Sequence, residues 1–465
     1  MPVRHSGGLV AALAFVVISA GLAQGPLDVS LVITNGIVVT MDGDRRILAP
    51  GAVAIDGARI AAVDRAEVVA AGYRGRDTID ASGAVIAPGL VNAHTHVPMV
   101  LYRGLADDLA LMEWLQKYIF PAEAKTVSPA FVAAGTRLAA AEMIRSGTTT
   151  YADMYYFEEE IGRATKRAGL RAVLGQTVIQ FPVADAKTPE ETLARTERFV
   201  KEFARDPLIT PAIAPHSMYT LDEDMLRRCR ALADKYAIPV LIHLAETEEE
   251  MKISAEKHRM TPAAWLDSLG FWKPGTLAAH GVWLTPADLD ILRRASVGVA
   301  HNPESKMKLA SGIAPVPAMR KAGLPVGLGT DGAASNNDLD MFEAMRQAAF
   351  LHKVGSKDPR VLPAGDALAM ATIEGARALN MADRIGSLEP GKQADVIVVE
   401  MTALRQTPLY DPVSHLVYAT HGDDVRTTIV DGKVLMRDRR LLTLDVNSVI
   451  AEARTIAEQV KAAVR

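Results

Sequence analysis

Ala84-Val-Ile-Ala-Pro88-Gly-Leu-Val-Asn-Ala-His94-Thr-His96 is the stretch of this 465-residue chain that is most informative about its fold. Apolar residues lead through Pro88 and Gly89 into a short strand that ends in two histidines two residues apart. Side chains at i and i+2 of a strand point to the same face, so both imidazoles can reach one metal ion beyond the strand end. Imidazole suits zinc and iron, and such an ion can lower the pKa of a bound water to about 7. Two ordinary strand histidines would give the same pattern. Residues farther along the chain are therefore needed to distinguish a metal site from two structural histidines.

Composition indicates a soluble globular protein with one large domain and a smaller one. The hydrophobic fraction is 49% and the charged fraction 23%, both ordinary values. The formal net charge is -4, and lysine and arginine are scattered along the chain, which argues against a nucleic-acid partner. We therefore expect a small-molecule substrate. Cys229 is the single cysteine, which excludes an intrachain disulfide and cysteine-based metal sites.

The N-terminus is typical of an export signal. Arg4 and His5 precede an almost unbroken apolar stretch, residues 9–18, and small residues follow at Gly21-Leu22-Ala23. The stretch is shorter than the roughly 20 residues that span a bilayer. We therefore predict a signal peptide over residues 1–23, a periplasmic or secreted mature protein, and no stable membrane span after its removal.

Both ends of the chain are rich in short strands. Residues 29–40 and 52–60 have a strand-turn-strand pattern, and residues 394–399 and 427–435 repeat it. The simplest interpretation is one small β-sandwich domain built from residues 24–86 and 386–440. A polar helix is expected within residues 441–465.

The middle of the chain, residues 87–385, alternates apolar strands with amphipathic helices. Predicted helices include residues 131–146 and 222–236, and predicted strands include 212–214, 239–244, 277–280, 297–300 and 325–330. Repeated strand-helix units of this total length favour an α/β fold, a TIM-like (β/α)₈ barrel. Functional residues should then lie just past the carboxyl ends of the strands.

Polar residues follow the apolar run at each of several predicted strand ends. They are His94 and His96, His216, His243 with Glu246 three residues on, His280, and Asp331. A buried polar group without a partner costs about 1–3 kcal/mol, so core packing alone would rarely place this set at one end of successive strands. The pattern therefore predicts a shared site.

Three imidazoles and one carboxylate make a sound mononuclear metal site with room for water. The predicted ligands are His94, His96, His243 and Asp331, holding one Zn²⁺ per subunit, with Fe²⁺ as the alternative. A second metal is not expected, because the fourth strand ends at His216 without a lysine to bridge two ions. Glu246 is the candidate to move a proton between water and leaving group. His280 is the candidate to hold the developing oxyanion or to orient the attacking water.

Three further residues have either a structural or a substrate-binding role. His301 ends another apolar run and either lines the pocket or packs in the core. Trp114 and Glu123 follow Asp107-Asp108 in an apolar helical stripe, whose first expected role is packing. Both could instead face the substrate as part of a cover.

Taken together, these motifs resemble the amidohydrolase superfamily over residues 29–440. Longer strings, residues 103–109, 301–305 and 329–337, are similar to the 5′-methylthioadenosine/S-adenosylhomocysteine deaminases. The resemblance implies hydrolytic deamination at C6 of an adenine ring, with Asp331 and His280 assisting the attack of water. Glu246 would donate a proton to N1 and then to the departing amine.

The same resemblance suggests how the substrate binds. It implies that Glu123 binds the ribose hydroxyls, that His216 lies on the ribose side, and that Trp114 lies near the ligand. Members that accept S-adenosylhomocysteine carry arginines after the strand that corresponds to Arg171-Ala-Val-Leu174. Here Gly175 and Gln176 follow, and glutamine cannot bind a carboxylate as arginine does.

We therefore expect 5′-methylthioadenosine or adenosine as substrate in preference to S-adenosylhomocysteine. An amino- or chlorohydrolase of triazine-type or other heterocycles is the alternative, because the same chemistry serves any activated ring carbon. An inactive periplasmic purine-binding protein is the alternative from another class. The sequence leaves a homo-oligomer open.

Overall fold

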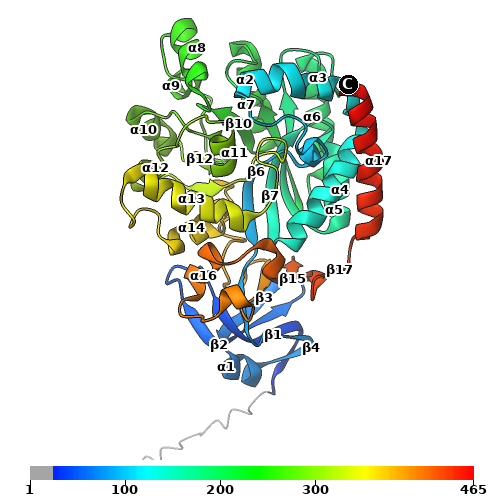
Figure 1. Ribbon diagram of the computed structural model, residues 1–465, viewed down its shortest axis with the longest axis vertical. Helices are drawn as coiled ribbons and strands as arrows, with labels where there is room; N and C mark the ends of the chain where they lie inside the picture. Colours follow the sequence, from blue (N-terminus) through cyan, green and yellow to red (C-terminus); the bar gives the residue numbers. More distant parts are fainter. Residues whose placement is uncertain (1–24, 465) are drawn as a thin grey trace, which may run out of the picture.

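The computed structural model describes residues 25–464, which form a parallel barrel and an adjoining β-sheet unit (Figure 1). The predicted signal peptide, residues 1–23, lies outside the described residues. Between residues 25 and 464, no helix combines the length and apolar character needed to cross a bilayer.

Eight parallel strands form the barrel and confirm the predicted fold class. In sequence order they are β6 (Leu90–Thr95), β7 (Thr148–Tyr155), β8 (Arg171–Val178), β9 (Ile209–Pro215), β10 (Val240–Leu244), β11 (Thr276–His280), β12 (Gly298–His301) and β13 (Val326–Leu328). Each strand pairs with the next, and the residues that follow β13 return to β6. The Asp331 amide donates to the His94 carbonyl at 3.0 Å, which closes the barrel at its carboxyl end.

Helices cover the outside of the barrel, and local sequence signals set where they begin. Ser128 caps α4 by accepting from the Phe131 amide, and Asp222 caps α7 by accepting from the Met225 amide. Around the barrel lie α4 (Pro129–Arg145), α5 (Glu158–Ala168), α6 (Pro189–Phe203), α7 (Glu223–Tyr236), α8 (Glu248–His258), α9 (Pro262–Ser268), α10 (Pro286–Arg294), α11 (Pro303–Lys308), α12 (Val316–Lys321), α13 (Met341–Ser356), α14 (Ala364–Met370) and α15 (Ile373–Ala378). The long excursion after β6 holds η1 (Val97–Tyr102), α2 (Leu111–Glu113), η2 (Trp114–Ile119) and α3 (Phe120–Thr126).

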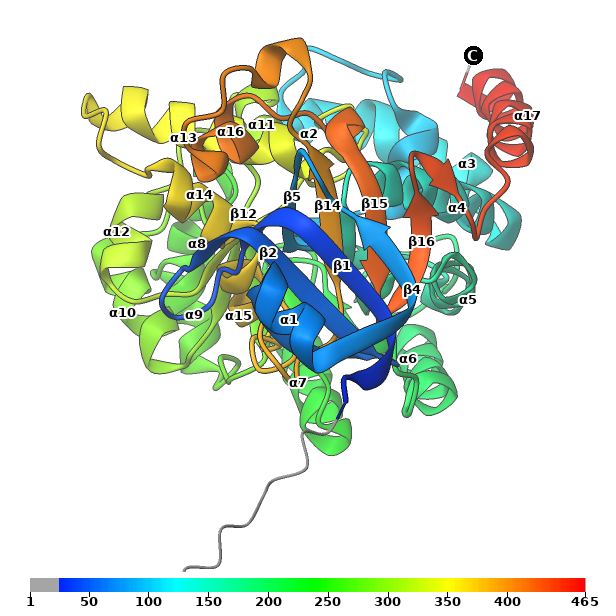
Figure 2. The ribbon, with the colours of Figure 1, turned by 90° about the horizontal axis from the view of Figure 1, so that it is seen from below.

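Both ends of the chain share one nine-stranded sheet, as expected for a composite β-domain. Its strands are β1 (Leu27–Val39), β2 (Ile47–Asp56), β3 (Arg59–Arg65), β4 (Tyr73–Asp80), β5 (Ala84–Pro88), β14 (Val396–Glu400), β15 (Val425–Val430), β16 (Lys433–Arg437) and β17 (Arg440–Leu441). The antiparallel pairing of β5 with β14 joins the N-terminal strands to the C-terminal ones. Figure 2 shows these blue and orange strands lying side by side. Fully buried side chains of both sets, including Ile33, Val53, Val398 and Ile429, share one core.

Smaller elements complete this unit: α1 (Ala66–Gly72), α16 (Pro412–Tyr418), η3 (Leu404–Gln406) and η4 (Gly422–Asp424). The C-terminal helix α17 (Val446–Val464) leaves the sheet and runs along α4, where Arg137 Nε donates to Glu452 Oε2 at 3.0 Å (Figure 1).

The sheet packs against the amino ends of the barrel strands. Gly169, just before β8, has a φ of 92°, and a side chain there would lie 2.6 Å from Leu435 Cδ2 of β16. In Figure 1 the sheet lies below the barrel, whereas α2 and α8 lie at the top. The carboxyl ends of the strands therefore remain free to build a site.

Candidate metal centre and active site

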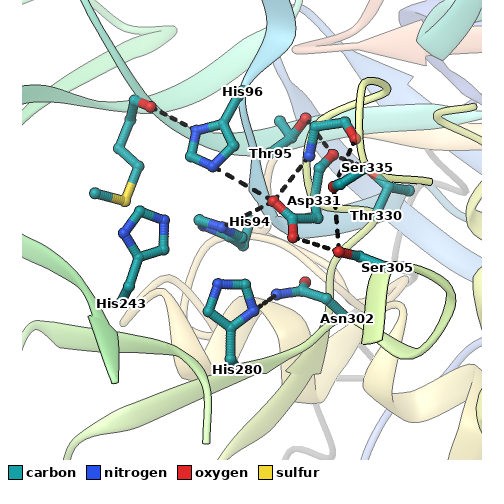
Figure 3. A network of polar contacts seen from close by, with 12 residues as sticks. His94, Thr95, His96, His243, His280, Asn302, Ser305, Thr330, Asp331 and Ser335 are labelled. Atoms are coloured by element: carbon teal, nitrogen blue, oxygen red, sulfur yellow. Dashed lines mark hydrogen bonds and ion pairs between the residues drawn. The ribbon is translucent and has the colours of Figure 1, made fainter. Parts of the chain in front are cut away.

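The four predicted metal ligands come together at the carboxyl end of the barrel (Figure 3). The ligand atoms of His94, His96 and His243 lie within 4.8 Å of one another, and so do those of His94, His280 and Asp331. Asp331 Oδ1 lies 3.5 Å from His94 Nε2 and 3.4 Å from His96 Nε2. Residues more than 200 positions apart in the chain thus converge on one point because strand ends meet there.

Hydrogen bonds on the far side of the rings hold two of the imidazoles in place. His96 Nδ1 lies 2.7 Å from the Met154 carbonyl, and His243 Nδ1 lies 2.8 Å from the His216 carbonyl. Each Nδ1 therefore donates, and in the neutral form of each ring Nε2 keeps a lone pair directed toward the centre. His94 Nε2 is buried and has no hydrogen-bond partner among the described residues. A cation at this point would satisfy it, so the residues present fit a metal ion.

The three imidazoles of the predicted ligand set differ in their pKa values. Burial opposes protonation of His96, but the neighbouring Asp331 and Asp153 outweigh it and raise the pKa of His96 to about 9. Burial lowers the pKa of His94, and burial together with the neighbouring His216 lowers the pKa of His243 well below the usual value. Both rings are then neutral, the form that binds a metal. Burial opposes ionisation of Asp331, but the close approach of His94 and His96 outweighs it and holds the pKa of Asp331 well below its usual range.

Two of the site residues have a backbone conformation that is costly for a residue with a side chain. His280 has a φ of 80° and Asp331 a φ of 63°. Such conformations cost about 1–3 kcal/mol and persist where the surroundings impose them. Asp331 is held by the bond of its amide to the His94 carbonyl and by Ser305 Oγ, which donates to Asp331 Oδ2 at 2.7 Å.

Glu246 and His280 stand next to the ligand cluster. Glu246 Oε2 lies 3.6 Å from His280 Nε2. Asn302 Nδ2 donates to His280 Nδ1 at 2.9 Å, so a neutral His280 carries its hydrogen on Nε2, the nitrogen nearest Glu246. Burial raises the pKa of Glu246 above its usual value, which allows this carboxyl to take up and release a proton.

A cavity opens over this cluster, and His96, His243 and Asp331 of the cluster line it. One wall is apolar and comes mainly from the excursion after β6: Met99, Leu111, Trp114, Leu115, Ile119 and Phe120. Trp114, Glu123, His216 and Glu246, all expected to contact substrate, line the cavity. His301 does not. It is 1% exposed, and its Nε2 lies 3.1 Å from His352 Nε2 of α13, so this histidine packs behind the site.

Glu123 is the polar group of the excursion that faces the cavity. Tyr155 Oη donates to Glu123 Oε1 at 2.6 Å, and burial raises the pKa of Glu123 to about 7. A carboxylate in this setting can accept hydrogen bonds from hydroxyl groups of a ligand.

The sequence did not predict several of the contacts made within the site. Tyr155, Asn302 and Ser305 orient Glu123, His280 and Asp331 respectively, and Lys306 forms an ion pair with Glu246. Lys306 directly follows the string 301–305, but a lysine in a short helix is ordinarily a surface residue. Only its burial in the tertiary structure distinguishes Lys306.

A (β/α)₈ barrel with imidazoles and a carboxylate gathered at the carboxyl ends of its strands defines a class of metal-dependent hydrolases. Comparison with known families agrees: residues 85–435 match the model of the Amidohydrolase family. The chain belongs to this family.

Similar proteins extend over nearly the whole chain. A protein of Syntrophobacter fumaroxidans named 5-methylthioadenosine/S-adenosylhomocysteine deaminase is 48% identical over 438 residues, 94% of this chain and 100% of the relative. A 5′-deoxyadenosine deaminase of Methanosarcina acetivorans is 46% identical over 435 residues, 93% of this chain and 98% of the relative. The crystal structure of an adenosine deaminase from Xanthomonas campestris with bound zinc has a TM-score of 0.92 at 40% identity, and covers 94% of this chain and 100% of that one.

Proposed function

We propose that the chain is a zinc-dependent aminohydrolase that converts an adenosine derivative and water into the inosine-type product and ammonia. The observation that carries the proposal is the position of Glu246, a buried carboxyl with a raised pKa beside the ligand cluster and on the cavity wall. The relatives named as deaminases support the same reaction.

The side chains divide the reaction among them. A single zinc ion, or iron as the alternative, held by His94, His96, His243 and Asp331 would supply Lewis-acid activation of water at neutral pH. Glu246 takes one proton from the attacking water and passes it to N1 of the ring. His280 Nε2–H donates a hydrogen bond to the incoming oxygen. Asp331, kept ionised, accepts the second proton of the added water and returns it through Glu246 to the departing amine, which leaves as ammonia.

The cavity favours a substrate without a charged group on the 5′ side. Among the described residues that line it, none is lysine or arginine. Gln176, which lies within β8 and not after it, donates to Asp185 Oδ2 at 2.8 Å and is fully buried. The amino-acid carboxylate of S-adenosylhomocysteine would thus be desolvated without a cation. We infer 5′-methylthioadenosine, 5′-deoxyadenosine or adenosine as the substrate.

A panel of these nucleosides, S-adenosylhomocysteine and an aminotriazine, followed by ultraviolet absorbance and ammonia release, tests the proposal. We expect turnover of nucleosides with an uncharged 5′ group. Glu246→Gln should retain zinc and keep only a small residual activity, whereas Glu249→Gln, at an exposed position on the adjoining helix, should remain fully active. Turnover of the triazine alone would favour the heterocycle hydrolase, and binding without turnover would favour a purine-binding protein.

Export to the periplasm or the medium is a separate proposal, supported by the basic start, apolar stretch and small residues within residues 1–23. Cell fractionation and N-terminal sequencing of the mature protein test it, and an uncleaved cytoplasmic product would contradict it. A homo-oligomer likewise stays a prediction, which light scattering would check.

A further inference from the structure

One lysine lies inside the candidate active site. Lys306, on α11, is 1% exposed. Its Nζ forms an ion pair with Glu246 Oε1 and lies 3.6 Å from Asp331 Oδ2. In the described part of the chain, these are the two carboxylates within ion-pair distance of Lys306. Burying an ammonium group costs several kcal/mol, which its contact with Glu246 has to offset.

The two carboxylate oxygens of Glu246 have different surroundings. Oε1 is bound by Lys306, whereas Oε2 lies 3.6 Å from His280 Nε2. The backbone of Glu246 is fixed separately, because the amides of Ala245 and Glu246 each donate to Glu250 at 2.9 Å. Only the side-chain torsions of Glu246 remain free, and the ion pair with Lys306 restrains them.

We propose that Lys306 is a positioning residue that holds the Glu246 carboxylate in one orientation, so that Oε2 is the oxygen presented to the substrate. This inference rests on the proposed function. A glutamate side chain has several staggered conformers, and a displacement of about 1 Å at a reacting group can cost about 10²-fold in rate. Lys306 itself does not line the cavity, so its contribution falls on the chemical step and not on substrate binding.

Replacement of Lys306 in the zinc-loaded enzyme tests the inference. We expect Lys306→Met to lower kcat about 10²-fold, with KM changed less than about threefold and zinc content unchanged. Lys306→Gln, whose amide can still donate to Oε1, should recover part of the loss. Lys321→Met, which removes an exposed lysine of α12, is the matched control and should leave kcat and KM unchanged.

A double-mutant cycle separates action through Glu246 from any other role. If Lys306 acts by orienting Glu246, then adding Lys306→Met to Glu246→Gln should change kcat by less than about twofold. A general structural role would lower kcat by the same factor in both backgrounds. If Lys306→Met does not fold, Lys306→Gln completes the same cycle.

Three results would overturn the inference: an undiminished kcat in Lys306→Met, an equal further loss in the Glu246→Gln background, or a loss of zinc, which would place the effect at Asp331. Each of these leaves deamination by the unmodified enzyme intact, and with it the proposed function. An unmodified, zinc-loaded enzyme that released no ammonia from any nucleoside would instead refute the proposed function, and the inference with it.

Discussion

Arg171 and Asp395 form a buried two-point ion pair that ties the barrel to the β-sheet unit. Arg171 Nε and Nη2 donate to the two carboxylate oxygens of Asp395 at 2.9 and 3.1 Å, and Nη2 also lies 3.1 Å from Asp431 Oδ1. Arg171 is the first residue of β8, and Asp395 directly precedes β14. The arginine side chain is 1% exposed and that of Asp395 3%. β8, one of the strands that supply no predicted metal ligand, thus anchors the composite domain.

Breaking this pair should destabilise the protein markedly. Removing one partner of a buried ion pair leaves an uncompensated charge and costs about 3–5 kcal/mol. We expect that loss in the free energy of unfolding for Arg171→Gln, measured by urea denaturation. The control is Arg163→Gln, because Arg163 makes a similar two-point contact with Glu202 at the surface, where such a pair contributes about 1 kcal/mol or less. Equal losses in the free energy of unfolding of the two variants would contradict the role of Arg171 as a buried anchor between the barrel and the sheet.

Loss of one predicted ligand should abolish stoichiometric metal binding. We expect purified His243→Ala to contain much less than one metal ion per chain, because it removes one of three converging imidazoles. His258→Ala, which alters a histidine that stacks on Trp265 away from the cluster, should retain the metal content of the unmodified protein. Elemental analysis of both preparations measures the metal content. One metal ion per chain in His243→Ala would exclude His243 as a ligand.

Glu123 should act on substrate binding. Its carboxylate lies on the cavity wall with Tyr155 as its partner, and a hydrogen bond to a charged group contributes about 1.5–3 kcal/mol. We expect Glu123→Gln to raise KM for adenosine about 10-fold or more with a smaller change in kcat. Tyr155→Phe should have a weaker effect of the same kind. An unchanged KM would show that Glu123 does not bind the ribose.

The pH profile provides an independent check on Glu123. Burial raises its pKa to about 7, so the carboxyl is neutral below that pH and charged above it. The affinity for nucleoside should therefore fall as the pH decreases through 7 in the unmodified enzyme. That dependence should be absent from Glu123→Gln, which has no group to titrate. Substrate affinity measured from about pH 5.5 to 8.5 on both proteins shows whether Glu123 is the group that titrates.

Two buried carboxyls under the site predict how stability depends on pH. Burial raises the pKa of Asp153 from 3.8 to about 7, and burial and the neighbouring Asp153 raise that of Glu158. Because the folded-state values lie above the unfolded ones, the native chain binds more protons between these limits. The free energy of unfolding should thus decrease as the pH rises from about 4.5 to 7, by up to about 1.4 kcal/mol per pH unit for each proton.

Glu158→Gln tests this dependence. Glu158 Oε1 accepts from the Tyr155 amide at 2.7 Å, and the glutamine carbonyl can keep that bond while its amide group donates to Asp153. Above pH 7 the free energy of unfolding of the variant should be at least as large as that of the unmodified protein. It should also decrease less steeply as the pH rises. Parallel curves for the two proteins would show that Glu158 is ionised in the native state.

The barrel and the convergence of the predicted metal ligands were predictable from sequence for the same reason. Apolar runs at residues 239–244 and 277–280 became β10 and β11, and the histidine of each run lies at or near the strand end. Parallel strands end on one face of a barrel, so a list of polar strand ends is also a list of neighbours. Strand bounds were less certain: the predicted strand 325–330 spans only Val326–Leu328.

Residues that act through packed segments were not predictable in this way. His301 ends its strand as His280 does, but α13 places His352 against it and removes it from the cavity. Lys306 and Glu246 are 60 positions apart, and nothing in either local sequence indicates that the lysine is turned inward.

The alternation of strands and helices, the composite β-domain and the gathering of the predicted ligands at one end of the barrel followed from the sequence alone, because hydrophobic periodicity and strand direction are local properties of the chain. The tertiary structure alone decided which carboxyls are paired, which histidine faces the cavity and which arginine joins the two units. Those outcomes depend on burial and on contacts such as Arg171 with Asp395, 224 residues apart, whose energies arise only once water is excluded between the packed segments.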